Sequence, residues 1–323
     1  MSLKISNLSK KHGDIWILRD VSFEVERGEI FGLLGESAAK SAVLRLIYGS
    51  EKPDSGGIFF DNRDLTESAA KERSFVLLPN AERGFLKNIF KSRNIKDLSD
   101  SKQQELVIEC ALENKEKVLL LDNPFSAMDL EQRDEIYENL RQAAKEKNLA
   151  IVVATNDSEE AFALCNRVGV LHGGEVIQTG TPREIYETPN SLAAARALGR
   201  NNLIRAQRAS FNNHQTQEFQ TIMGEHRLRT DNTDKNLLGA INSPVALAIR
   251  PEHISISFGA SFPEDNLLKA KIVGVQYLGA TTRVSLDANG LPLEALVLRL
   301  VGLNVGDECL VGLPPDRILV LKD

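Results

Sequence analysis

Short, almost wholly apolar segments that alternate with helix-like segments constrain the fold of this 323-residue chain most strongly. The apolar segments cover 30–34, 117–122 and 150–155, and the helix-like segments cover 41–48, 129–147 and 158–166. Strands buried on both faces occur mainly in parallel sheets that helices cover. We therefore expect a parallel α/β sheet in the N-terminal part of the chain.

A different pattern begins near residue 200. Residues 207–236 are polar, and from Val245 onward short strand-like segments follow one another between turn signals. The dipeptide Asn289-Gly290 is typical of a two-residue hairpin turn. Strands at this spacing without helices predict a small β-barrel or sandwich, so we expect two domains, 1–198 and 199–323.

Charge and cysteine content limit the classes of function. The 39 lysines and arginines against 45 aspartates and glutamates give a net charge of −6, which argues against a generic nucleic-acid-binding surface. The three cysteines are widely spaced and are typical of reduced thiols in the cytosol. No apolar run approaches the roughly 20 residues that span a bilayer, and the N-terminus lacks a signal-peptide core. We expect a cytoplasmic protein that binds no nucleic acid.

The segment between the first apolar strand and its helix is similar to a phosphate-binding loop with two defects. Such a loop has the pattern G-x-x-x-x-G-K-[ST], in which backbone N–H groups and the lysine hold phosphates and the hydroxyl binds Mg²⁺. Gly35, Lys40 and Ser41 are present, but Gly35 precedes Lys40 by five positions rather than six, and Ala39 replaces the second glycine. By itself this segment is equally compatible with an ordinary strand-to-helix turn.

Four segments together make the chain resemble the ATP-binding subunit of ABC transporters, of the importer type that ends in a β-rich TOBE domain. They are 31–66, 117–129, 154–189 and 249–253, and they follow the order of that family. The resemblance implies an α/β fold of the P-loop NTPase class, an ABC-type nucleotide-binding domain, followed by a small OB-like β-barrel. It implies ATP and Mg²⁺ as cofactors. It also implies membrane-spanning subunits and a substrate-binding protein as partners, with this chain peripheral on the inner face of the cell membrane.

The resemblance assigns nucleotide-binding roles by position. The residues are His12, Gly35, Ser37, Lys40, Ser41, Ala42 and Asp122. Ser41 and Asp122 would hold Mg²⁺. His12 stands where the family has an aromatic side chain that stacks on adenine, and a plain surface histidine is the alternative because imidazole stacks less well. We expect the nearby Trp16 to lie in the core.

Positions that carry the hydrolytic chemistry in the family are altered here. The glutamate that polarises the attacking water falls at Asn123, and the histidine that contacts the γ-phosphate falls at Asn156. An amide cannot accept a proton, so general-base assistance of about 10²–10⁴-fold should be missing.

The signature sequence LSGGQ, which contacts the partner's nucleotide in the family's dimer, reads LSDSKQ at 98–103. Ser99 is retained, whereas Asp100 and Ser101 replace two glycines. Asp100 would place negative charge beside a polyphosphate. Asp129 matches the loop that crosses the dimer interface, and it is also placed to cap the helix from 130.

The region that docks the membrane-spanning partner in the family is much reduced. Only 17 residues lie between Asn80 and Leu98, so we expect a shortened helical subdomain over about 80–98. The glutamine that couples nucleotide to the membrane subunit falls at or beside Pro79-Asn80.

These losses fall on contacts to phosphate, water and partners, whereas the scaffold is kept. We predict an ATP-binding subunit of an ABC importer with weak nucleotide binding and impaired or absent hydrolysis, a pseudo-ATPase. We expect a monomer, or a homodimer held through the C-terminal domain. The alternative is a non-catalytic regulatory or assembly module that binds a partner or small ligand through its β domain. Ferric iron, polyamines, sugars and oxyanions all fit as cargo, and the resemblance slightly favours an inorganic ion such as ferric iron.

Overall fold

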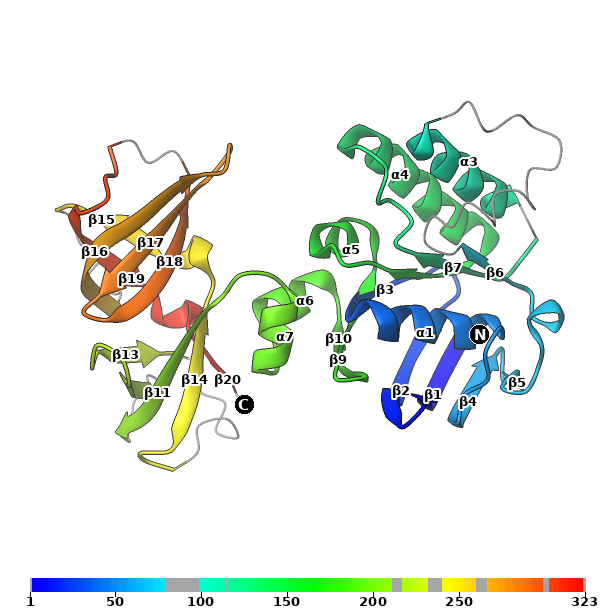
Figure 1. Cartoon of the computed structure of the whole chain (residues 1–323), viewed down its shortest axis with the longest axis horizontal. Coiled ribbons are helices and arrows are strands. Elements are labelled where there is room, and N and C mark those ends of the chain that lie inside the picture. Colours follow the sequence, from blue (N-terminus) through cyan, green and yellow to red (C-terminus); the bar gives the residue numbers. More distant parts are fainter. Residues whose placement is uncertain are drawn as a thin grey trace. The chain divides into compact units, whose positions relative to one another are not determined.

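The chain forms two compact units, Met1–Glu187 and Thr188–Asp323, in the computed structural model (Figure 1). The structure describes residues 2–78, 99–113, 115–210, 217–231, 240–259, 266–298 and 302–321. The expected helical subdomain at 80–98, with Pro79, Asn80 and Leu98, lies outside the described residues. The two units divide after Glu187, whereas we had expected the boundary after residue 198.

A six-stranded sheet with the order β10-β9-β3-β8-β7-β6 organises the described part of the first unit. Its strands are β3 (Ile30–Gly35), β6 (Phe75–Leu78), β7 (Val118–Asp122), β8 (Ala150–Ala154), β9 (Arg167–His172) and β10 (Glu175–Gly180). The three apolar segments of the sequence became the neighbouring strands β3, β8 and β7, which pair in parallel. The parallel α/β sheet is therefore confirmed.

Helices follow these strands along the chain, as the sequence predicts. They are α1 (Ser37–Tyr48), α3 (Asp100–Glu113), α4 (Leu130–Lys147), α5 (Ser158–Leu164) and α6 (Pro182–Glu187), with a short 3₁₀ turn at Ala70–Glu72. Helix α1 begins earlier than expected: residues Ser37 to Lys40 form its first turn instead of a loop. Ala38 and Ala39 favour a helix, and no glycine interrupts them.

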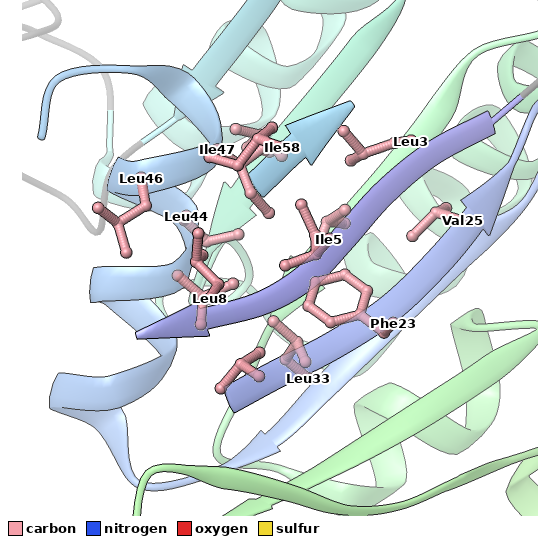
Figure 2. Close-up of a cluster of buried hydrophobic side chains, with 14 of the residues drawn as sticks. Leu3, Ile5, Leu8, Phe23, Val25, Leu33, Leu44, Leu46, Ile47 and Ile58 are labelled. Carbon is pink, nitrogen blue, oxygen red and sulfur yellow. The ribbon is translucent and has the colours of Figure 1, made fainter. Parts of the chain in front are cut away.

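A second sheet of the first unit, β2-β1-β4-β5, packs against α1. Its strands are β1 (Ser2–His12), β2 (Ile15–Glu26), β4 (Ser55–Phe60) and β5 (Arg63–Asp64). Side chains of α1, among them Leu44 and Ile47, face Ile5 of β1 and Ile58 of β4 in one buried cluster (Figure 2). This cluster fixes α1 between the two sheets and so positions its N-terminal turn.

The expectation that Trp16 lies in the core is wrong. Its side chain is 39% exposed, and the ammonium of Lys11 on the paired strand lies 4.4 Å from the centroid of its ring. A cation over the indole face stabilises this exposed position.

The second unit contains two five-stranded antiparallel sheets among its described residues, with the orders β13-β12-β11-β14-β20 and β15-β19-β16-β17-β18. The first sheet comprises β11 (Asn202–Ser210), β12 (Gln217–Thr221), β13 (Arg227–Thr230), β14 (Pro244–Ile249) and β20 (Leu319–Leu321). The second comprises β15 (Ser255–Ser257), β16 (Asn266–Tyr277), β17 (Thr282–Ala288), β18 (Leu291–Val297) and β19 (Glu308–Leu313), and 3₁₀ turns occupy Pro251–His253 and Pro315–Arg317. Apolar side chains of both sheets form one core, so the predicted small barrel-like β domain is confirmed.

The turn between β17 and β18 is the predicted hairpin. Asn289 and Gly290 have φ of 51° and 88°, the positive pair that a tight primed turn requires.

Helix α7 (Leu192–Ala197) belongs to the second unit. Its Ala195 packs in a cluster with Ala248 of β14 and Leu321 of β20, which explains why this unit starts before residue 198. Among the described residues, no helix combines the length and apolar character needed to cross a bilayer.

Candidate functional site

Gly35 at the end of β3 sets the start of the candidate nucleotide site. Its φ is +124°, and a Cβ built on it would lie 1.9 Å from the carbonyl oxygen of Leu171 on β9. Only glycine adopts this conformation in this space. Glu36 follows in an extended conformation, and its carboxylate accepts a hydrogen bond from the Gly173 N–H at 3.0 Å. The strand-to-helix junction is therefore held against the end of β9 at Leu171 and against the turn that follows β9 at Gly173.

The first turn of α1 stands where a phosphate loop would lie. The backbone N–H of Lys40 donates to the Glu36 carbonyl at 3.0 Å, as in any helix, and is not free to face a phosphate. No described side chain caps this turn. The N–H groups at a helix start favour anions, but a single turn offers fewer of them than a wrapped loop.

Lys40 is wholly buried and points to the end of β8. Its Nζ donates to the Thr155 carbonyl oxygen at 2.5 Å and to Asn156 Oδ1 at 2.6 Å. Burial lowers the pKa of Lys40 to about 8, and the nearby Asp122 carboxylate opposes that shift. The ammonium is thus already held by two acceptors of its own chain.

Asn156 brings two predicted nucleotide-binding residues together. Its Oδ1 accepts hydrogen bonds from Lys40 Nζ and, at 2.9 Å, from Ser37 Oγ. A histidine at this position would not supply the same carbonyl-type acceptor.

Ser41 and Asp122 lie together as a magnesium site requires. Ser41 Oγ donates to Asp122 Oδ2 at 2.6 Å, and Asn123 Nδ2 donates to Asp122 Oδ1 at 3.1 Å. A hydroxyl and a carboxylate are oxygen ligands of the kind that Mg²⁺ prefers, so these two residues fit the ion. Asn123 itself has a φ of 45°, and its backbone N–H donates to the Ala154 carbonyl at 2.8 Å.

These side chains border an open pocket of about 690 Å³, which we call the nucleotide pocket. It is lined by Ile17, Ser37, Ala38, Ser41, Arg45, Asn123, Ser126, Arg133, Thr155, Asn156, Asp157 and Glu160. Lys40 and Asp122 do not line the pocket themselves but bond to residues that do: Lys40 to Thr155 and Asn156, and Asp122 to Ser41. Its two arginines are paired: Arg45 Nε lies 2.5 Å from Glu51, and Arg133 Nη1 lies 2.9 Å from Glu160.

The pairing of Arg133 and Glu160 is a feature that sequence reasoning missed. Arg133 also donates from Nε to the Met128 carbonyl at 3.1 Å, and Glu160 Oε2 accepts from Thr155 Oγ1 at 2.5 Å. Burial raises the pKa of Glu160, and Arg133 and the Thr155 hydroxyl oppose the rise. The acidic pair Asp157 and Glu160 after Asn156 was the available signal, but its cation comes from a distant helix.

The signature segment contacts its own chain. Ser99 Oγ accepts from the Lys102 N–H at 3.3 Å at the start of α3, and Ser101 Oγ donates to Gln132. Asp100 is exposed in the first turn of α3. Asp129 caps α4, since its Oδ1 accepts from the Gln132 N–H at 3.0 Å, which confirms the capping role. The first turn of α3 and the N-cap of α4 therefore both bond to Gln132.

Two predicted nucleotide-binding residues lie elsewhere. His12 is exposed at the end of β1 and is not among the described residues that line the nucleotide pocket. The Ala42 side chain is buried in the hydrophobic cluster around α1, so only its backbone could contribute to a site.

Comparisons with known proteins agree with this architecture. An ABC transporter family model matches residues 18–89 and a TOBE domain model matches 247–321. The spermidine/putrescine import ATP-binding protein PotA of Legionella pneumophila (strain Paris) is 30% identical, over 88% of this chain and 86% of its own length. The molybdate/tungstate import ATP-binding protein WtpC of Pyrococcus horikoshii is 27% identical, over 95% of this chain and 96% of its own. The structure of cbiO1 from Clostridium perfringens, part of the ABC transporter complex cbiONQ, matches with a TM-score of 0.50 and 25% identity, over 58% of this chain and 90% of that one.

Proposed function

This chain belongs to the ATP-binding subunits of TOBE-containing ABC importers, and from that premise we propose that it binds Mg-ATP weakly and hydrolyses it slowly or not at all. One observation carries the proposal. The first turn of α1 replaces the phosphate loop, and the Lys40 ammonium is bonded to Thr155 O and Asn156 Oδ1. A polyphosphate has to displace both contacts before Lys40 can serve it, and that cost lowers the affinity.

The end of β7 supports impaired hydrolysis. Ser41 and Asp122 would hold Mg²⁺, which supplies charge neutralisation at the phosphates when bound. Asn123 takes the place of the water-activating acid, and its amide donates to Asp122 instead of accepting a proton. The step that suffers most is therefore activation of the attacking water.

The signature supports a weakened closed dimer. In a head-to-tail pair of chains, Asp100 would approach the partner's nucleotide, and two negative groups repel each other there. We therefore propose a monomer, or a dimer held through the second unit and insensitive to ATP.

The relatives support the remaining assignments. We assign membrane-spanning subunits and a substrate-binding protein as partners at the inner face of the membrane. The names of the relatives specify import of spermidine and putrescine or of molybdate and tungstate. A small polyamine or oxyanion is thus the cargo that these relatives support, beside the inorganic ion such as ferric iron that the family resemblance slightly favours.

Titration with Mg-ATP by calorimetry and thermal unfolding tests the binding part. A ligand specific to the folded state stabilises it by about 2.7 kcal/mol at 100 times Kd. We expect a saturable shift at millimolar ATP that Lys40→Ala abolishes and the exposed control Lys115→Ala keeps. Because burial lowers the pKa of Lys40 to about 8, the affinity of the wild-type chain and of Lys115→Ala should fall as the pH rises through that value. Micromolar affinity would contradict the proposal.

Phosphate release tests the hydrolytic part. We expect turnover near background, and Asn123→Glu alone should not restore it, since Asn156, Asp100 and the shortened loop remain. Ordinary turnover in the wild-type chain or in Asn123→Glu would refute impaired hydrolysis.

A further inference from the structure

A second hollow, in the second unit, differs in character from the nucleotide pocket. Its volume is about 440 Å³, within the range of small-molecule sites, which run from roughly 300 to 1,000 Å³. Leu192 of α7, Leu203 of β11 and Ala246 of β14 line it, and Leu192 and Leu203 also pack against the buried cluster of Ala195, Ala248 and Leu321. Helix α7 thus covers only part of this sheet face.

Two cations that line this hollow have no partner among the residues that the structure describes. Arg196 of α7 and Arg205 of β11 both line it and are both exposed. Within the described ranges neither guanidinium forms an ion pair or a side-chain hydrogen bond, and none of the described lining residues is acidic. By contrast, Arg200 nearby in the sequence is paired with Glu294 at 3.1 Å. We call this feature the arginine hollow.

Apolar side chains extend the arginine hollow to the surface. Ile222 lines it and is 55% exposed, and the adjacent Met223 is 52% exposed. The backbone holds Ile222 in place, since its N–H donates to the Arg205 carbonyl at 2.9 Å. Exposed apolar surface beside unpaired cations favours a ligand that has both an apolar body and a negative head.

We propose that the arginine hollow binds a small amphipathic anion. A carboxylate or sulfonate head would bond to the guanidinium groups of Arg196 and Arg205, which present planar donor pairs to such oxygens. The apolar body would cover Leu192, Leu203 and Ile222 and remove them from water. The site needs no nucleotide, so it stands independently of the proposed ATP chemistry.

Octanoate is the probe, with octylammonium as the cation of equal length. Isothermal calorimetry on the full chain should show saturable octanoate binding and much weaker octylammonium binding. The double variant Arg196→Gln/Arg205→Gln should weaken octanoate at least tenfold. Arg227→Gln, which changes an exposed arginine outside the hollow, should leave it unchanged. Millimolar Mg-ATP should not compete, because the nucleotide pocket lies in the other unit.

A second variant tests the site without removing either arginine, so that a misfolded double variant cannot decide the result. Ala246→Leu adds bulk at a lining position that pairs with Arg205 and keeps both charges. It too should weaken octanoate binding, with circular dichroism as the check on folding. Absence of octanoate binding at several millimolar, equal binding of octylammonium, or an equal loss in Arg227→Gln would overturn the proposal. Binding only to phosphatidylglycerol vesicles, lost in the double variant, would overturn it as well, since it would assign the surface to a membrane.

Discussion

The nucleotide pocket and the arginine hollow hold their cations in opposite ways. At the nucleotide pocket, Lys40, Arg45 and Arg133 each bond to an oxygen of the same chain. At the arginine hollow, Arg196 and Arg205 have no such partner among the described residues. A ligand of the first pocket must break internal bonds before it gains its own, whereas a ligand of the second must only displace water. The presence of basic side chains therefore does not by itself measure the affinity of a site for anions.

The largest loss of unfolding free energy in either unit is expected from a substitution at Gly35, just before α1. Gly35→Ala forces a Cβ to within 1.9 Å of a carbonyl oxygen at a positive φ, so the first unit should lose about 3 kcal/mol of unfolding free energy. Urea unfolding followed by the fluorescence of Trp16, the single tryptophan, reports this unit. Octanoate binding should persist.

Gly173→Ala is the matched control for that substitution. Its φ is also positive, at 59°, but nothing lies within 4 Å of the added Cβ. It should cost about 1 kcal/mol, and equal losses in the two variants would show that backbone strain, not the contact with Leu171, explains the glycine.

A smaller effect is expected from releasing one internal bond of the nucleotide pocket. Arg133→Met leaves the buried Glu160 carboxylate without its cation and should cost about 2 kcal/mol at pH 8, less than for a fully buried pair because Arg133 keeps some contact with water. Burial already raises the pKa of Glu160, and the loss of Arg133 raises it further. When the pKa of a carboxyl group is raised in the folded state, the free energy of unfolding of the protein falls as the pH rises through that pKa. The cost should therefore be smaller at pH 5 than at pH 8.

The double variant Arg133→Met/Glu160→Gln separates the charge from the packing. It should recover part of the loss and abolish its pH dependence, as measured by urea unfolding at both pH values. A loss in Arg133→Met that does not vary with pH would show that Arg133 acts by packing alone.

The smallest effects concern one helix cap beside each pocket. Asp129→Ala removes the acceptor of the Gln132 N–H in α4, and Ser191→Ala removes the acceptor of the Ala194 N–H in α7. Each variant should lose about 1 kcal/mol of unfolding free energy. Only Ser191→Ala should weaken octanoate, because α7 forms a wall of the arginine hollow. Asp129→Asn and Ser191→Thr, which retain a cap, should behave as the wild type.

Local patterns were enough to predict the parallel sheet, the hairpin at Asn289-Gly290 and the cap at Asp129. Each depends on residues within a few positions of one another, or on strands buried on both faces. The orientation of Lys40 was not predictable, because its acceptors lie at Thr155 and Asn156, more than a hundred residues away. The arginine hollow was missed for the same reason, since α7, β11 and β14 meet only in three dimensions. The prediction that Trp16 is buried was wrong because one cation, Lys11 on the neighbouring strand, stabilises the exposed ring.

The fixed positions of Gly35 and Lys40 have a consequence for any attempt to rebuild a phosphate loop in this chain. One end of the segment is fixed on Leu171 and the other on Thr155 and Asn156, and only four residues join them. A point substitution such as Ala39→Gly changes the flexibility of that segment but not its contour length. Restoring the spacing of a full phosphate loop therefore requires inserting one residue between Gly35 and Lys40, which no substitution can supply.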